Sequence, residues 1–331
     1  MMRMNFRKAI TVARITNAPA AAFGIAGLLA LGIGHAHAGY TFQAIVDPLN
    51  PGFTQALGIN NAGAIAGYGN GTVFNGFVLT PPSSFTRENF PGADGGTQVI
   101  GISGSGTTVG FFVIAGTTHG FAQTGGIFTV INAPGTAFTQ LLGINATGTI
   151  AAGYSSIDPA GATLQKALTV TVGTSAFTDI NALLPANINS QATGVNNTGE
   201  VVGFYQNGAG NFSAFTDIGG AIKSFEALGS LSTQALGVND LGQIVGDYVD
   251  VVGVMHGFLD TGGLFITIDL PGSTATTING INDHGQVVGF FTAASGSTIG
   301  VVGTVPEPAS LALLGTGAVI LAGINRRRPI A

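Results

Sequence analysis

The sequence predicts an all-β fold of about six units, each made of four short strands. Three observations support this. One motif recurs six times, its copies start about 43 residues apart, and residues 40–304 show no sustained helical periodicity. Leucine-rich repeats are shorter, and helical repeats of similar length need amphipathic helices. Four strands in about 43 residues are typical of a β-propeller blade.

The motif is clearest at residues 280–291, which read Gly-Ile-Asn-Asp-His-Gly-Gln-Val-Val-Gly-Phe-Phe. Each copy starts at a glycine, and the six glycines are Gly58, Gly101, Gly143, Gly194, Gly237 and Gly280. They are 43, 42, 51, 43 and 43 residues apart. The 51-residue interval indicates a longer loop, which we place at residues 155–165.

Each unit reads as four segments in a fixed order. The first ends in Gly-Ile/Val-Asn, and the second is an apolar strand such as residues 200–205 or 286–291. The third begins with a His-Gly-Phe-like tripeptide, and the fourth is a Phe-Thr-x-Ile-like strand. β-Branched and aromatic residues favour strands, whereas Asn-Asp-x-Gly and Gly-Gly favour tight turns with positive φ.

The two ends of the array predict a closed ring. Residues 40–46 read as a fourth strand without a preceding unit, and residues 299–304 read as a third strand without a fourth. Pairing the first strand with the last unit would remove two exposed sheet edges. We therefore predict six blades closed by the N-terminal strand, with a five- or seven-bladed ring or an open β-solenoid as alternatives.

Two features of the motif predict the core. The Val-Val-Gly strand carries small residues and is expected to lie innermost, because strands near a propeller axis pack closely. The repeated phenylalanines of the third segment are expected to pack between blades, not to form a ligand platform. They are Phe77, Phe121, Phe215 and Phe258.

Composition excludes several classes of function. The chain has 331 residues, 45% of them hydrophobic, and no cysteine, so disulfides and cysteine chemistry are excluded. Residues 39–304 contain three basic and fourteen acidic residues, a net charge of −11. Nucleic-acid binding needs a basic surface, so we expect no nucleic-acid partner.

Residues 1–38 are predicted to be a secretory signal peptide with a helical apolar segment. A basic start precedes an apolar stretch at residues 18–33. Ala36 and Ala38 are small residues at the two positions that a signal peptidase reads, so cleavage is expected after Ala38. The alternative is an uncleaved membrane anchor.

Residues 305–331 have a different character. Val305 is followed by Pro306, Glu307 and Pro308, then by an apolar run at residues 311–324. The run is short for a membrane span, which typically needs roughly 20 residues. A basic cluster follows it and fits a stop on the cytoplasmic side; it consists of Arg326, Arg327 and Arg328. We expect a short transmembrane helix that anchors the chain transiently.

These three parts together resemble the PEP-CTERM sorting signal of Gram-negative bacteria. The resemblance implies export by the secretion machinery, cleavage near Pro306-Glu307-Pro308 by an exosortase, and a place at the outer surface or in an exopolysaccharide (biofilm) matrix. The same tail is also known as an ice-binding-protein C-terminal domain. The repeats resemble extracellular HAF repeats, in which His119 and His256 match the first position and Asn75, Lys166 and Ser213 depart from it.

Metal and cofactor sites are not predicted. His119 and His256 fall at the same place in different units, and His284 lies in a turn, so they should not cluster. Asn239-Asp240 and Asn282-Asp283 look like pieces of a Ca²⁺ loop, as do Asp247 and Asp250. They lack alternating ligands and a closing Glu, so we expect Asx turns.

No catalytic residue is assigned. Glycoside hydrolysis needs two facing carboxylates, and the candidates near strand ends recur with the repeat without any pair standing apart; they are Asp179, Asp217, Asp260 and Asp269. Residues 101–106 look like a serine-nucleophile elbow, but they occupy the position of the motif turn.

The preferred function is a non-enzymatic surface or matrix protein that mediates adhesion or associates with exopolysaccharide. The alternative is an extracellular glycoside hydrolase or lyase that uses carboxylates on one propeller face. Ice binding would need a flat threonine-rich face around Thr274, Thr276 and Thr277. Convergent axial carboxylates with a buried His or Arg would favour the enzyme. A face of repeated Asn, Thr and Asp would favour binding.

Overall fold

The computed structural model describes residues 39–185 and 188–304. The predicted signal helix and the predicted transmembrane helix of the tail lie outside the described residues. The described chain is all-β, apart from the single 3₁₀ turn η2 (Asn181–Leu183). No helix within these residues is long and apolar enough to cross a membrane.

The strands of the first half are β1 (Thr41–Ile45), β2 (Thr54–Ile59), β3 (Ile65–Asn70), β4 (Phe74–Thr80), β5 (Ser84–Arg87), β6 (Gly96–Ile102), β7 (Thr108–Ile114), β8 (Thr117–Thr124), β9 (Ile127–Ile131), β10 (Phe138–Ile144), β11 (Ile150–Ser156), β12 (Lys166–Thr171) and β13 (Ala176–Asp179). Those of the second half are β14 (Ser190–Val195), β15 (Glu200–Gln206), β16 (Phe212–Ile218), β17 (Ala221–Phe225), β18 (Ser232–Val238), β19 (Gln243–Val249), β20 (Met255–Thr261), β21 (Leu264–Ile268), β22 (Ser273–Ile281), β23 (Val287–Ala293) and β24 (Thr298–Thr304).

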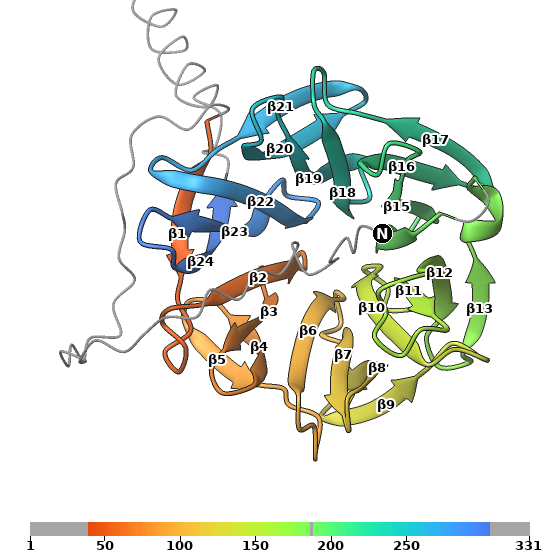
Figure 1. Ribbon diagram of the computed structural model, residues 1–331. Helices are drawn as coiled ribbons and strands as arrows, with labels where there is room; N and C mark the ends of the chain where they lie inside the picture. Colours follow the sequence, from red (N-terminus) through yellow and green to blue (C-terminus); the bar gives the residue numbers. More distant parts are fainter. Residues whose placement is uncertain (1–38, 186–187, 305–331) are drawn as a thin grey trace, which may run out of the picture.

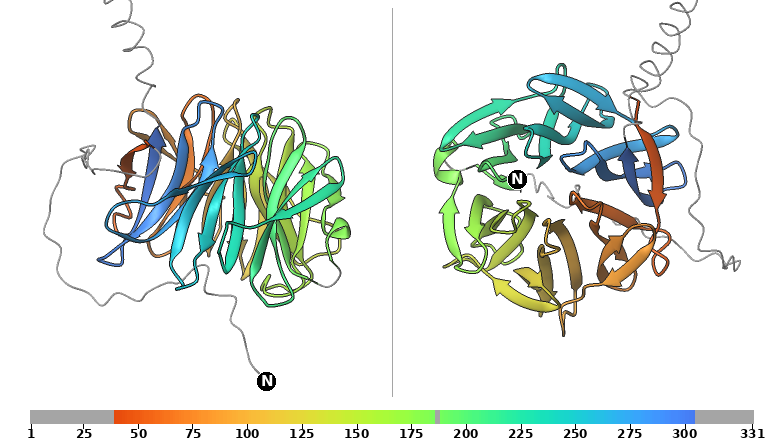
Figure 2. Two further views of the ribbon diagram at one scale, coloured as in Figure 1. Left: turned by 90° about the horizontal axis from the view of Figure 1, so that it is seen from above. Right: turned by 180° about the vertical axis from the view of Figure 1, so that it is seen from behind.

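The sheets stand around a common axis and form a propeller-like ring (Figure 1). Four sheets have four strands each: β10–β13, β14–β17, β18–β21, and β22–β24 with β1. The remaining sheet has eight strands, β2–β9, and one parallel pair, Phe74 with Gly96, joins its two halves. Figure 2 shows the ring from above and from behind.

The first strand pairs with the last. β1 runs antiparallel to β24, from Thr41 opposite Thr304 to Ile45 opposite Gly300. The red N-terminal strand therefore lies beside the blue C-terminal one (Figure 1), and it completes a sheet whose other three strands come from the end of the array.

A ring of glycines surrounds the axis. The first strand of each repeat has a register shift just before its motif glycine. A Cβ on any of these six glycines would lie 3.0–3.3 Å from the Cα of the next one around the axis, and the contact from Gly280 returns to Gly58. Real Cβ atoms rarely approach backbone this closely, so only glycine fits without displacement.

The expectation that the Val-Val-Gly strand lies innermost is wrong. The strands that carry the ring glycines are innermost, namely β2, β6, β10, β14, β18 and β22. The Val-Val-Gly glycine lies one strand further out and makes room for the phenylalanine of the third strand. A Cβ on Gly203, for example, would lie 2.8 Å from the Phe215 ring.

The core lies between neighbouring sheets. Phe77, Phe121, Phe215 and Phe258 are fully buried, which confirms that they are core residues. The longer loop of the third repeat is also confirmed, because β11 ends at Ser156 and β12 begins at Lys166.

Candidate functional site

The turns after the innermost strands form a hydrogen-bonded belt at one mouth of the axis. The side-chain amides of Asn196, Asn239 and Asn282 donate to the carbonyls of Asn239, Asn282 and Asn60, each at 3.0 Å. Asn60 donates to Ser103 at 2.9 Å. The side-chain oxygen of Asn239 accepts from the backbone N–H groups of Leu241 and Gln243, and that of Asn282 closes its own turn similarly. The Asx turns expected at Asn239 and Asn282 are thus confirmed, and Asp250 forms another, since its side chain accepts from the N–H groups of Val252 and Val254. The expectation is wrong for Asp247, which is buried within β19.

In four of the six turns the next residue extends this belt, namely Asn61, Asn197, Asp240 and Asp283. The carboxylate of Asp240 accepts from the backbone and side-chain nitrogens of Asn197, both at 2.7 Å. Asp283 accepts from the backbone of Asp240 at 2.9 Å and from the side chain of Asn61 at 2.7 Å. The cavity lined by these turns has a volume of only about 50 Å³. Since these carboxylate oxygens already accept from neighbouring turns, the axial mouth is a structural feature.

The outer rim carries a second repeated feature, which we name the rim pair. One member opens the His-Gly-Phe-like tripeptide, and the other follows the fourth strand 13 or 14 positions later. Four rim pairs are hydrogen-bonded: Asn75 with Asn89 at 3.2 Å, His119 with Asn132 at 3.0 Å, Ser213 with Glu226 at 2.8 Å, and His256 with Asp269 at 2.9 Å.

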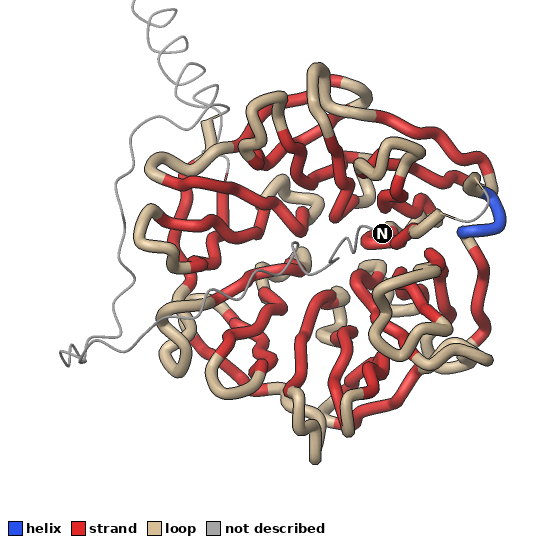
Figure 3. Tube along the Cα trace, in the orientation of Figure 1, coloured by secondary structure: helices blue, strands red, loops and turns tan. Residues whose placement is uncertain are grey.

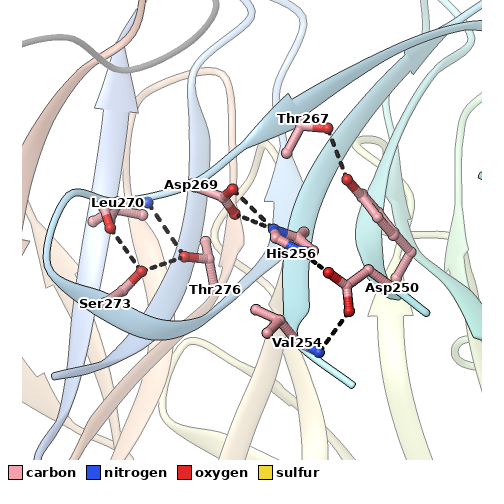
Figure 4. Close-up of polar contacts among 9 residues, drawn as sticks. Asp250, Val254, His256, Thr267, Asp269, Leu270, Ser273 and Thr276 are labelled. Carbon is pink, nitrogen blue, oxygen red and sulfur yellow. Dashed lines mark hydrogen bonds and ion pairs between the residues drawn. The ribbon is translucent and has the colours of Figure 1, made fainter. Parts of the chain in front are cut away.

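The rim pair of His256 has an additional carboxylate (Figure 4). Its Nδ1 lies 2.9 and 3.0 Å from the two oxygens of Asp269, and its Nε2 lies 3.3 Å from Asp250. The imidazole stacks on Tyr248 with ring centroids 5.1 Å apart. Partial burial alone lowers the pKa of His256, but Asp269 and Asp250 outweigh it and raise the pKa above its usual value. Both ring nitrogens are occupied, so this histidine is poorly placed for proton transfer or metal binding.

His119 is the matching histidine of the second repeat. Its ring stacks on Phe112 at 5.3 Å, and Phe112 stacks on Phe90 at 3.7 Å. Its Nδ1 lies 3.0 Å from the side-chain amide nitrogen of Asn132. The two histidines therefore lie in different sheets, as expected. In the part of the chain that the structure describes, no three His, Cys, Asp or Glu side chains form a group suited to a metal.

The third repeat differs from the other four. Its tripeptide opens at Lys166, but the longer turn between β12 and β13 places Asn181 in the partner position, because Leu168 lies opposite Asp179 and the N–H of Ile180 donates to Ala167. Lys166 begins β12 and Asp179 ends β13, and both are exposed. They are not among the ion pairs of residues 39–185 and 188–304. Instead both line a cavity of about 330 Å³ with Asn181, Ala182 and three apolar residues, Leu164, Leu184 and Ile188.

The carboxylates considered for glycoside hydrolysis act within their own sheets. Asp217 and Asp260 accept from the backbone N–H groups of Gly220 and Gly263, at 2.8 and 2.7 Å. Asp179 accepts from Ala182 at 3.3 Å, and Asp269 contacts His256. These contacts tie each carboxylate to its own sheet and assemble no catalytic pair from the four.

Two further sequence hypotheses can be placed. Ser103 Oγ accepts from the backbone of Thr107 at 3.0 Å, so residues 101–106 form a motif turn, as predicted, and not a nucleophile elbow. Thr276 and Thr277 are buried, so they cannot belong to an exposed ice-binding face.

Two buried acids, Asp47 and Glu88, went unnoticed in the sequence, and the burial of a third, Asp247, was not expected. Asp47 is paired with Arg87 and also accepts from Asn50 at 2.8 Å. Glu88 accepts from the hydroxyl of Thr108 at 2.6 Å. Burial raises the pKa of Asp247 to about 7, and a hydrogen bond with Thr277 opposes the rise. Aligning the repeats would have revealed Asp247, since the others carry an aromatic residue there: Tyr68, Phe111, Tyr154, Phe204 and Phe290.

Comparison with known proteins decides where the chain belongs in the cell. Residues 304–328 match the PEP-CTERM protein-sorting motif. The PEP-CTERM motif implies an exported, cell-surface protein that an exosortase recognises. Apart from Thr304, the motif lies outside the described residues, as do Ala36, Ala38, Pro306, Glu307, Pro308 and the three arginines.

The other comparisons concern the fold. No curated protein matches the chain. The structure is similar to that of a protein described as TolB from Agrobacterium tumefaciens, with a TM-score of 0.55 and 11% identity over 83% of this chain and 100% of that one. It is also similar to AofleA from Arthrobotrys oligospora, with a TM-score of 0.50 and 12% identity over 79% and 86%. At these identities the likeness is one of propeller fold alone.

Proposed function

We propose that this PEP-CTERM protein is a non-enzymatic component of the cell surface or extracellular matrix that binds polysaccharide through a six-bladed propeller. The count of six follows if the eight-stranded sheet is divided at its single parallel bridge between Phe74 and Gly96. The six ring glycines and the pairing of β1 with β24 support the same count and a closed ring.

Two processing steps belong to this proposal. The signal peptide is removed after Ala38, directed by Ala36 and Ala38. The tail then spans the inner membrane transiently, with Arg326, Arg327 and Arg328 on the cytoplasmic side, until an exosortase cuts near Pro306, Glu307 and Pro308. The released domain extends from residue 39 to about residue 305.

The rim pairs carry the binding proposal. They place paired polar side chains at one position in four repeats around the ring, and the candidate catalytic carboxylates are tied to their own sheets. A polysaccharide is a repeating ligand, so several weak sites on one rigid ring can bind it together with much higher overall affinity than any one site. A propeller also hosts enzymes, so the fold by itself does not decide the function.

A glycan array tests the proposal. The exported protein is purified and applied with and without Ca²⁺, and each glycan that binds is then incubated with the protein and checked for cleavage. Saturable binding to an intact polysaccharide is the expected result. Cleavage of the glycan would overturn the proposal in favour of a hydrolase or lyase, and no binding to any glycan would overturn polysaccharide binding.

A further inference from the structure

The third repeat breaks the rule that the other rim pairs follow. In four repeats the donor and the acceptor of the pair satisfy each other. In the third repeat these two positions are held by Lys166 and Asn181, and the oxygen of Asn181 accepts from Ser190 instead. Lys166, Asn181 and the nearby Asp179 all line the 330 Å³ cavity, and neither Lys166 nor Asp179 belongs to an ion pair of the described residues. A strong donor and a strong acceptor are therefore both left for another molecule.

The extra residues of this repeat build the walls of the cavity. Leu164 comes from the lengthened loop between β11 and β12, and Asn181 and Ala182 come from η2, which connects β13 to β14 (Figure 3). Asp179 is oriented by the backbone N–H of Ala182 at 3.3 Å. Asn181 is oriented because its side-chain oxygen accepts from the hydroxyl of Ser190 at 2.7 Å, which leaves its NH₂ group as a donor.

We propose that this cavity binds one neutral sugar unit of a polysaccharide; this rests on the proposed function and locates its site. Each sugar hydroxyl can both donate and accept, so it suits the ammonium of Lys166, the amide of Asn181 and the carboxylate of Asp179. The apolar side chains of Leu164, Leu184 and Ile188 suit the C–H face of a pyranose ring. The volume lies at the lower end of the roughly 300–1,000 Å³ of small-molecule pockets, which fits one sugar and not a longer oligosaccharide.

The charge of the site favours a neutral sugar. Lys166 and Asp179 carry opposite charges, and the propeller around them has a net charge of −11. An acidic sugar would be attracted by one lysine but repelled by Asp179 and by the field of the whole domain. Uncharged hexoses are therefore the first probes.

The test uses the exported protein and the methyl glycosides of D-glucose, D-galactose and D-mannose, with binding followed by calorimetry and saturation-transfer NMR. At least one glycoside is expected to bind. Lys166→Met and Asp179→Asn should each weaken that binding at least tenfold. Lys223→Met is the matched control, because Lys223 is an exposed lysine on β17 that does not line this cavity, and it should bind as the parent does.

Ala182→Phe provides a second, independent test, because it fills the cavity and leaves Lys166 and Asp179 in place. It should abolish hexoside binding with an unchanged thermal midpoint. The proposal is overturned if no hexoside binds, or if either Lys166→Met or Ala182→Phe binds like the parent. If polysaccharide capture on the array survives Ala182→Phe, the matrix function stands and this site is wrong. If a hexoside binds in the cavity but no polysaccharide is captured, the matrix function is wrong.

Discussion

Asp247 is a single buried residue that should make the stability of the protein depend on pH. It replaces the aromatic residue of the other repeats and is buried near Thr277 of the neighbouring sheet. A buried carboxyl is far more stable in its neutral form, so its pKa rises to about 7. Because its folded-state pKa lies above the unfolded value, its contribution to stability is fully present below about pH 4 and is lost as pH rises through 7.

Asp247→Asn removes this titration while keeping the shape of the side chain. The variant should match the parent near pH 4 and exceed it at pH 8 by up to about 4 kcal/mol, since each pKa unit corresponds to about 1.4 kcal/mol. Urea unfolding at pH 4, 6 and 8 measures the difference. A constant difference at the three pH values would contradict the assignment.

His256 should also stabilise the protein more at low pH than at high pH. For His256 the folded state favours the charged form, whereas for Asp247 it favours the neutral form. The raised pKa of His256 means that its bonds to Asp269 and Asp250 stabilise the fold at low pH and weaken as pH rises through the folded-state pKa. His256→Gln is therefore expected to destabilise more at pH 6 than at pH 9. The effect should stay below about 1 kcal/mol, because partly exposed ion pairs are screened. An equal loss at both pH values would show that only packing on Tyr248 matters.

At the scale of the element, each innermost strand combines a bulge with a glycine that touches the next sheet. The glycine recurs plainly in the sequence. Its close backbone contact is not predictable, because the contacted glycine lies about 43 residues away in another repeat. For this reason the small residues of the Val-Val-Gly strand wrongly predict an innermost position. Small residues indicate close packing without saying which strand supplies the partner.

The ring glycines can be tested with one substitution and a control. In Gly194→Ala the new Cβ would lie 3.0 Å from Val202 and 3.2 Å from the Cα of Gly237. We expect a loss of about 1–3 kcal/mol, as for other overpacked interiors. Gly208→Ala is the control, because a Cβ there meets no atom within 4 Å. Chemical denaturation compares the two, and equal stability would contradict the tight contact.

The rim shows the same limit of sequence reasoning. The repeat pattern predicts that His119 and His256 hold equivalent positions. Their partners, Asn132 and Asp269, follow a different strand. One sequence does not reveal the register between two strands, so these pairs were not predicted. The cavity at Lys166 and Asp179 depends on a longer loop that was predicted and on the 3₁₀ turn η2 that was not. Recurring positions were thus predictable, and the departures from them were not.

At the scale of the molecule, β1 and β24 hold the two ends of the domain together. Thr41 lies opposite Thr304, so the ends are neighbours although more than 260 residues of chain separate them. Deleting residues 39–46 would expose the edge of β24 and leave its sheet with three strands. We expect a thermal midpoint lower by at least about 10 °C and a tendency to associate through the free edge.

Calorimetry and light scattering measure both effects. The control is Thr41→Ala, which alters an exposed side chain and keeps the strand. A deletion variant that stays monomeric and melts like the parent would show that β1 is dispensable.

The pairing of the two ends also sets an order in time. On the proposed export route the chain would emerge from its N-terminus, so residues 41–45 would reach the outside before their partner, residues 298–304. β1 would therefore emerge first and form its strand pairing last. The sorting motif starts at residue 304, the last residue of β24, so on this route the final strand pair would form as the tail reaches the membrane. On the proposed route, pairing of β1 with β24 would therefore coincide with arrival of the sorting tail.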